Sequence, residues 1–246
     1  MTGAHAPTLE RPAAVSSPDP LTQALDQAFN LRDVATTEVL LIRHAEPDYG
    51  AIRRGGDPFD PPLTARGRAQ AMRLAERLGT EPVDAIYTST MRRAFETAAV
   101  VAVSKDLPMT HIADLDEIRF DKAASEVPAS GNGRMPNGDV IGRLMNTMSW
   151  SSIPGLEPVR QFRHRTIQAL EAIVAGHTGE RVAIVCHGGV INAYLTMLLD
   201  IRRDLFFLPD YTSISVVRVL RDRYAVQRLN DATHLSPALS PRQKGG

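Results

Sequence analysis

Residues 38–44 read EVLLIRH, and residues 181–189 read RVAIVCHGG. Each stretch is a short apolar run that ends directly at a histidine, with an arginine before His44 and two glycines after His187. Apolar runs of this length, rich in Val, Ile and Leu, are typical of strands that are buried on both faces. The two stretches therefore predict two central, neighbouring strands of a covered sheet.

Strand-like and helix-like segments alternate along the rest of the chain. Short apolar runs predict further strands at Val83–Thr88, Pro108–Ile112, Ser213–Leu220 and Arg223–Leu229. Apolar residues at helical spacing predict helices after Thr64, around Ala94–Val101, at Val140–Met148, at Val159–Ala175 and around Ile191–Leu198. The alternation predicts an α/β fold, a three-layer α/β/α sandwich around a mostly parallel central sheet.

Composition divides the chain into three parts. The first 20 residues hold four prolines and have little to bury, so we expect residues 1–36 to be a flexible N-terminal arm with a possible short helix. Within the arm, Asp19 and Pro20 predict the N-cap and first position of a short helix. Residues 37–230 form the predicted main domain. Residues 231–246 are rich in Ser, Pro and Gly and predict a disordered tail.

Composition also excludes several classes of protein. The 246 residues carry 28 basic and 28 acidic side chains, so a net charge of zero gives no general attraction to nucleic acid or to an anionic membrane. Cys186 is the only cysteine, which rules out an intrachain disulfide and a cysteine-rich metal site. No apolar run approaches the ~20 residues of a membrane span, and the N-terminus lacks the pattern of a secretory signal. We expect a cytoplasmic protein without nucleic-acid or membrane partners.

Three predicted strands deliver basic side chains to one edge of the sheet. Arg43 and His44 follow the first apolar run, His187 follows the second, and Arg93 lies shortly after the strand at Val83–Thr88. Ligands of such sheets bind beyond the carboxyl ends of the strands. Each of these residues alone is also typical of an ordinary capping or surface position. Their convergence on one edge favours a functional site.

Five short segments follow one another within the predicted main domain. They are LLIRHAEP, PLTARGRAQA, YTSTMRRAFETA, LDEI and VCHGGV. In this order they resemble the signature segments of the histidine phosphatase superfamily, which includes the cofactor-dependent phosphoglycerate mutases. The resemblance places the family arginine on Arg93 and not on Arg92, the family acid on Glu117, and the second family histidine on His187. It implies a phosphoglycerate mutase-like fold for residues 37–230, a histidine phosphatase domain.

The resemblance implies a site for phosphoryl transfer. His44 is expected to attack phosphorus and form a phosphohistidine, while its other ring nitrogen donates to a backbone carbonyl. The phosphoryl group is expected to bind Arg43, Arg93, a protonated His187 and the start of the helix at Gly188. Glu117 is expected to protonate the leaving oxygen and then to take a proton from water. The implied activity is that of a metal-independent phosphomonoesterase that needs no cofactor and acts on a small-molecule phosphomonoester.

Departures from the family pattern distinguish between related activities. Ala45 replaces the usual glycine after the catalytic histidine. Pro47 and Gly50 stand where the mutases carry side chains that help to bind the phosphate. The missing side chains at Pro47 and Gly50, together with the short segment between Glu117 and Val159, favour a phosphatase over a phosphoglycerate mutase. A third alternative is a non-catalytic module that binds phosphate or protein on the same fold, and the presence of every catalytic residue type disfavours it.

The stretches least like the family, residues 49–62 and 120–148, are expected to face the substrate. Five of their charged residues are predicted to be solvated: Arg53, Arg54, Asp121, Lys122 and Arg134. Trp150 is predicted to pack into the domain. Asp116 is a carboxylic acid next to Glu117, so the choice of Glu117 as proton donor rests on the resemblance.

Overall fold

The computed structural model describes residues 19–23, 36–54, 57, 60–119, 138–220 and 223–235. The chain forms two units, Met1–Ala35 and Thr36–Gly246. In the first unit, the carboxylate of Asp19 accepts hydrogen bonds from the backbone N–H groups of Leu21 at 2.9 Å and Thr22 at 3.2 Å, and residues 20–23 are helical. Asp19 therefore caps a helical turn, as predicted.

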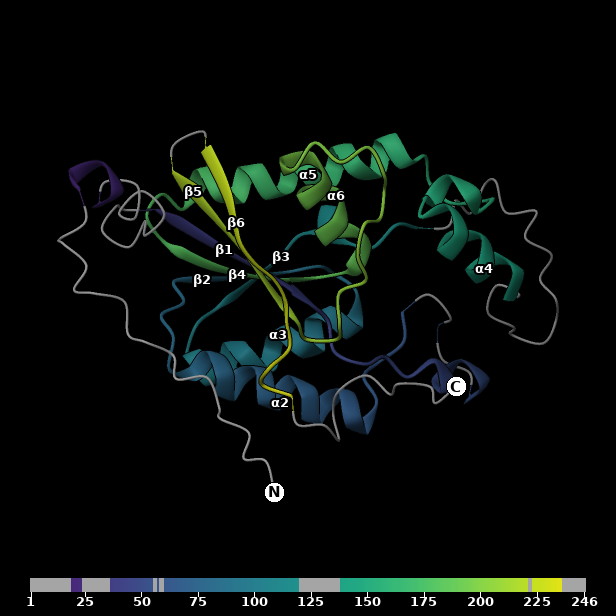
Figure 1. Cartoon of the computed structure of the whole chain (residues 1–246). Coiled ribbons are helices and arrows are strands. Elements are labelled where there is room, and N and C mark those ends of the chain that lie inside the picture. The colour runs from purple at the N-terminus through teal and green to yellow at the C-terminus, as the bar shows by residue number, and fades with distance from the viewer. Residues whose placement is uncertain are drawn as a thin grey trace, which may run out of the picture. The chain divides into compact units, whose positions relative to one another are not determined.

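A six-stranded sheet forms the centre of the second unit (Figure 1). Its strands are β1 (Thr37–Arg43), β2 (Ala85–Thr88), β3 (Met109–His111), β4 (Arg181–Cys186), β5 (Ile214–Leu220) and β6 (Arg223–Asp231). Their order across the sheet is β3-β2-β4-β1-β5-β6. The first four strands run parallel, and β5 and β6 close one side as an antiparallel pair. The prediction of a mostly parallel sheet is confirmed.

The two strands with the strongest apolar patterns are the central neighbours of the sheet. Strands β1 and β4 pair in parallel, and Arg43 lies opposite Cys186 at the last position of their register. The next residue of each strand is a histidine, so the pairing brings His44 and His187 to adjacent places at the carboxyl edge. The backbone N–H of His44 donates to the carbonyl of Cys186 at 2.9 Å and continues the ladder by one bond.

Helices cover both faces of the sheet, as Figure 1 shows. The described helices of this unit are α2 (Ala65–Gly79), α3 (Arg92–Lys105), α4 (Gly138–Thr147), α5 (Val159–Gly176) and α6 (Gly188–Leu198), with short 3-10 turns η2 (Tyr49–Arg54), η3 (Ala113–Leu115) and η4 (Trp150–Ser152). Helices α2 and α3 pack on one face, and α5 and α6 pack on the other. The three-layer prediction is therefore confirmed.

Alternation along β1 explains the two apolar layers. Val39 and Leu41 belong to the cluster under α5 and α6, whereas Leu40 and Ile42 belong to the cluster under α2 and α3. All four side chains are fully buried. A strand that is covered on both faces must be apolar at every position, which is why EVLLI reads as a continuous run instead of alternating.

The ends of some elements differ from the predicted ones. Strand β2 begins at Ala85 instead of Val83. Just before it, the backbone N–H of Asp84 donates to the carbonyl of Arg181 at 2.8 Å, and the carboxylate of Asp84 accepts the backbone N–H of Arg181 at 2.7 Å, so a side chain replaces the backbone acceptor there. Trp150 is half-buried and packs against the apolar cluster under α5 and α6, as predicted. Residue Asp231 still belongs to β6, and Leu235 is buried, so residues 231–235 of the predicted tail are part of the folded unit.

Several predictions fall outside the described residues. They concern most of the arm, the tail from residue 236 onward, and the side chains of Arg53, Arg54, Asp121, Lys122 and Arg134. Among the helices that the structure does describe, none has the length and apolar character needed to cross a membrane.

Candidate active site

His44 and His187 lie side by side at the carboxyl edge of the sheet. Their ring centroids are 5.1 Å apart and the rings are tilted by 56°. Both side chains are buried, with exposed fractions of 4% for His44 and 0% for His187. The two predicted histidines therefore form one site, held by the pairing of the strands that precede them.

The hydrogen bonds of His44 define which ring nitrogen carries the proton. Its Nδ1 lies 2.7 Å from the carbonyl oxygen of Ala45, an acceptor, so Nδ1 is the donor. The Nε–H of Arg93 donates to Nε2 at 3.2 Å, so Nε2 holds a lone pair. Burial, followed by the charges of Arg93 and Arg43, lowers the pKa of His44 well below its usual value. The ring is thus neutral, with an unprotonated Nε2 beside a guanidinium.

His187 is oriented by a serine that follows β2. Its Nε2 lies 2.7 Å from the hydroxyl of Ser89, which also accepts the backbone N–H of Met91 at 3.2 Å. Burial first, and then the charges of Arg93, His44 and Arg43, lower the pKa of His187 well below its usual value. This direction favours a neutral His187 in a site that holds only these side chains, whereas the sequence led us to expect a protonated one.

Two arginines from different elements supply the positive charge of the site. Arg93 lies in the first turn of α3, is only 7% exposed, and donates to His44. Arg43 ends β1, where its Nη1 donates to the carbonyl of Pro209 at 2.5 Å. The neighbouring Arg92 lies at the surface, where its Nε donates to Glu96 at 2.7 Å. The structure thus brings Arg93, and not Arg92, to the histidines.

Glu117 reaches the site from the segment after η3. Its Oε2 accepts the backbone N–H of Gly189 at 3.0 Å, in the first turn of α6. A Cβ atom on residue 189 would lie 2.1 Å from Oε1 of Glu117, so only glycine permits this approach. Gly188 opens the same helix, and a Cβ there would lie 4.0 Å from Nε of Arg43.

The adjacent Asp116 is engaged elsewhere. Its carboxylate accepts the backbone N–H of Thr90 at 2.8 Å, the hydroxyl of Thr90 at 2.9 Å, and a guanidinium N–H of Arg119 at 2.7 Å. Of the two neighbouring acids, Glu117 is the one whose carboxylate contacts the helix that begins after His187.

The loop after His44 is hydrogen-bonded to residues at the start of α2. The backbone carbonyl of Glu46 accepts the backbone N–H of Thr64 at 3.0 Å. The backbone N–H of Glu46 donates to the side-chain amide oxygen of Gln70 at 2.9 Å. A Cβ on residue 67 would lie 2.2 Å from the same carbonyl, so Gly67 is required by the close approach. The segment PLTARGRAQA therefore acts by holding the loop that carries the site histidine.

Sequence reasoning missed Tyr211. The guanidinium carbon of Arg43 lies 4.2 Å from the centroid of the Tyr211 ring, and that ring is 5.8 Å from the ring of His44. Burial raises the pKa of the Tyr211 hydroxyl. The predicted closing strands could have indicated Tyr211. Because β5 runs antiparallel to β1, the amino end of β5 lies at the edge of the sheet where β1 ends. Residues just before Ile214 thus belong to the site.

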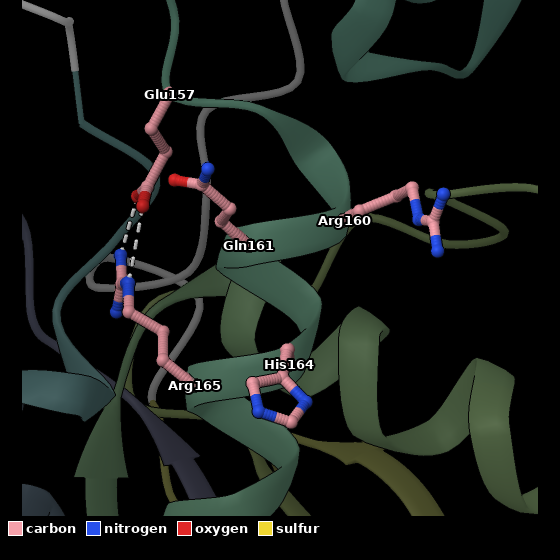
Figure 2. A pocket seen from close by; sticks show the side chains of 5 residues that line it. All are labelled: Glu157, Arg160, Gln161, His164 and Arg165. Carbon is pink, nitrogen blue, oxygen red and sulfur yellow. Dashed lines mark hydrogen bonds and ion pairs between the residues drawn. The ribbon is translucent and has the colours of Figure 1, made fainter.

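Other chemical features of the described residues are limited. These residues contain no group of three His, Cys, Asp or Glu side chains that could hold a metal ion. Cys186 is free and fully buried, and burial raises the pKa of its thiol. A separate hollow of about 550 Å³ lies along the first turns of α5 and is lined by Glu157, Arg160, Gln161, His164 and Arg165 (Figure 2). None of the predicted site residues lines that hollow.

Comparisons with known proteins agree on one family. The family model of the histidine phosphatase superfamily (branch 1) matches residues 39–232. In Arabidopsis thaliana, a phosphoglycerate mutase-like protein 4 is 29% identical over 85% of this chain and 92% of its own length. A metal-independent phosphoserine phosphatase of the same plant is 30% identical over 81% of this chain and 84% of its own length. The solved structure of Bacillus stearothermophilus YhfR has a TM-score of 0.64 and 31% identity, over 80% of this chain and 98% of that one.

Proposed function

The chain belongs to the histidine phosphatase superfamily, and from this premise we propose that it is a metal-independent phosphomonoesterase in which His44 carries the phosphoryl group. One observation carries the proposal. Nε2 of His44 holds a lone pair beside the guanidinium of Arg93, while Nδ1 is occupied by the carbonyl of Ala45. A histidine nucleophile needs this tautomer, because only the unprotonated nitrogen can attack.

Arg43, Arg93 and His187 bind the phosphoryl group in this proposal. Two buried side-chain nitrogens support it, since Nε of Arg43 and Nδ1 of His187 have no hydrogen-bond partner within the described part of the chain. Buried polar atoms without partners are rare in folded proteins, and each one calls for an explanation such as a ligand. Guanidinium groups suit a phosphate dianion, because they hold its oxygens in two directions and keep their charge.

Glu117 acts as acid and base in two successive steps. In the first step, Nε2 of His44 bonds to phosphorus, the ester P–O bond breaks, and Glu117 gives its proton to the leaving oxygen. In the second step, water attacks phosphorus, Glu117 takes a proton from the water, and the P–N bond breaks to release inorganic phosphate. The position of the Glu117 carboxylate at the N–H of Gly189, two residues after His187, supports this assignment.

The proposal favours hydrolysis over mutase chemistry. Pro47 has no hydroxyl or amide in its side chain, and its backbone is held in a bridge to Leu63, so it supplies no side-chain donor to a phosphate. The name of one relative points to phosphoserine, and the name of another to mutase-like proteins. We therefore take the substrate to be a small phosphomonoester. The proposal also takes residues 37–230 as the catalytic domain and the cytoplasm as the location of the protein. It includes no nucleic-acid or membrane partner.

A panel of phosphomonoesters tests the function. We expect the purified chain to release inorganic phosphate from phosphoserine or another member of the panel, and the His44→Ala variant to release none. Phosphate that moves between positions of a phosphoglycerate would indicate a mutase instead. No reaction with any member, together with measurable binding of phosphate, would indicate the non-catalytic module.

A further inference from the structure

Arg165, on the second turn of α5, makes an unusual set of contacts with the segment that carries Glu117. Its Nη1 donates to the carbonyl oxygens of Asp114 at 2.8 Å and Asp116 at 2.9 Å. Its Nη2 donates to the carbonyl of Glu117 itself at 3.3 Å. One guanidinium therefore fixes three backbone carbonyls over four consecutive residues.

Glu157 binds both the guanidinium of Arg165 and the backbone of Arg119. We call Arg165 and Glu157 together the clamp. The Glu157 carboxylate accepts Nε–H of Arg165 at 3.2 Å and Nη2–H at 2.5 Å, and Figure 2 shows the two side chains turned toward each other. The same carboxylate accepts the backbone N–H of Arg119 at 3.0 Å, and the backbone N–H of Glu157 donates to the carbonyl of Arg119 at 2.8 Å. Residues 114–119 are thus held at both ends by Arg165 and Glu157.

The clamp also connects to the partner of the Glu117 carboxylate. The guanidinium carbon of Arg165 lies 5.1 Å from the centroid of the Phe162 ring. The tip of that ring would lie 3.2 Å from a Cβ on Gly189, the residue whose N–H donates to Glu117. One turn of α5 therefore touches both the backbone of Glu117 and the glycine that its carboxylate contacts.

We propose that Arg165 is a positioning residue that, together with Glu157, sets the place of the Glu117 carboxylate during proton transfer. The inference rests on the proposed role of Glu117 as the acid that protonates the leaving oxygen. Proton transfer requires the carboxyl group within hydrogen-bond reach of that oxygen, and a displacement of about 1 Å can cost about 10²-fold in rate. Lysine cannot replace Arg165 here, because an ammonium lacks the planar fork that serves the three carbonyls and Glu157 at once.

The test compares two substrates in the same variant. An alkyl phosphate needs its leaving oxygen protonated, whereas p-nitrophenyl phosphate leaves as a stable anion. We expect Arg165→Lys to slow hydrolysis of the alkyl phosphate by about 10- to 100-fold and to slow hydrolysis of p-nitrophenyl phosphate far less. A variant that merely unfolds would lose both activities together, so equal loss on both substrates overturns the proposal, as does no loss on either.

Two further variants separate a positioning role from a structural one. Arg160→Lys makes the same chemical change on the same helix, and Figure 2 shows Arg160 pointing away from Glu157 and Arg165, so both activities should stay at the wild-type level. In a Glu117→Gln background, Arg165→Lys should add little to the loss on the alkyl phosphate, because the group that it positions is already gone. A full additional loss in the double variant would contradict the inference.

The same series distinguishes the inference from the proposed function. If Glu117→Gln alone fails to show a selective loss on the alkyl phosphate, the acid role of Glu117 is wrong. If Glu117→Gln shows the selective loss and Arg165→Lys does not, the proposed function stands and only the positioning role of Arg165 is wrong.

Discussion

Arg93 and His44 share a hydrogen bond in which the Nε–H of the arginine donates to Nε2 of the histidine at 3.2 Å. The bond occupies the lone pair that the proposed mechanism uses for attack. A phosphoryl group that enters the site offers the guanidinium stronger, charged acceptors, so Arg93 can turn to the phosphate oxygens and free Nε2 as the substrate binds. In the proposed mechanism, the arginine thus favours the unprotonated form of His44 before the reaction and binds the transferred group during it.

The protonation of His44 should depend on Arg93. Because burial and the Arg93 charge lower the pKa of His44, the ring should remain neutral at pH values below its usual pKa of about 6.5. Arg93→Met removes the charge, so the pKa should rise, and the acidic limb of the pH profile of kcat/KM should move to higher pH. The rate should also fall about 10²- to 10³-fold.

Titration of ring-labelled histidines by NMR checks the His44 pKa directly. Arg92→Met is the matched control, because Arg92 is paired with Glu96 at the surface, and it should leave the His44 pKa unchanged. A His44 ring that titrates near its usual value in the wild-type protein would contradict the prediction.

His44 should carry phosphate during turnover. Labelled substrate, followed by rapid quenching without acid, should trap an acid-labile phosphoenzyme, since a P–N bond is broken by acid. His44→Ala should remove the label. Labelling of that variant at the wild-type level would place the nucleophile on another residue.

Glu117→Gln should slow hydrolysis of an alkyl phosphate about 10²- to 10⁴-fold, the usual contribution of general acid–base catalysis. Hydrolysis of p-nitrophenyl phosphate should suffer much less. Steady-state rates with the two substrates measure the difference. Asp116→Asn is the matched control, because its carboxylate is bound to Thr90 and Arg119, and it should show no such selectivity. A selective loss in Asp116→Asn instead would mean that the neighbouring acid is the proton donor.

Activity should survive exhaustive chelation. The guanidinium groups of Arg43 and Arg93 supply the positive charge that a metal ion brings to other phosphatases. Rates measured before and after EDTA treatment should agree, and vanadate should inhibit by mimicking five-coordinate phosphorus. Loss of activity with EDTA that a divalent ion restores would refute metal independence.

Tyr211 should hold Arg43 in place for substrate binding. A cation–π contact contributes about 0.5 to 2 kcal/mol, so Tyr211→Leu should raise KM by about 2- to 30-fold. Tyr211→Phe keeps the ring over the guanidinium and should stay close to the wild-type KM. Equal effects of the two substitutions would mean that the hydroxyl, and not the ring face, matters.

The sequence was most informative about the centre of the sheet. EVLLI and RVAIVC are apolar at nearly every position, so their burial on both faces and their pairing could be predicted from local pattern alone. The placement of His44 and His187 at one edge then followed from chain direction. The choice of Arg93 over Arg92 came from the resemblance, because both residues lie at the start of the same helix.

Properties that depend on several distant elements were not predictable. The lowered pKa of His187 results from its burial and from charges on β1 and α3. Tyr211 was missed because the rule for ligand sites describes parallel strands, whereas β5 enters the same edge from the opposite direction. Arg165 lies about two turns into a predicted helix. Its contacts with residues 114–117 join positions that are 48 to 51 residues apart in the sequence, so local pattern could not indicate them.

Cys186 ends β4 immediately before His187, with its thiol fully buried and its pKa raised by that burial. Oxidants and alkylating reagents attack the thiolate form of cysteine, and burial disfavours the thiolate form of Cys186. The sole sulfhydryl of the chain therefore lies one residue from a site histidine in a form that reacts slowly with oxidants. Peroxide inactivates a phosphatase with a thiolate nucleophile by oxidising that thiolate, and a site whose proposed nucleophile is a histidine does not depend on one.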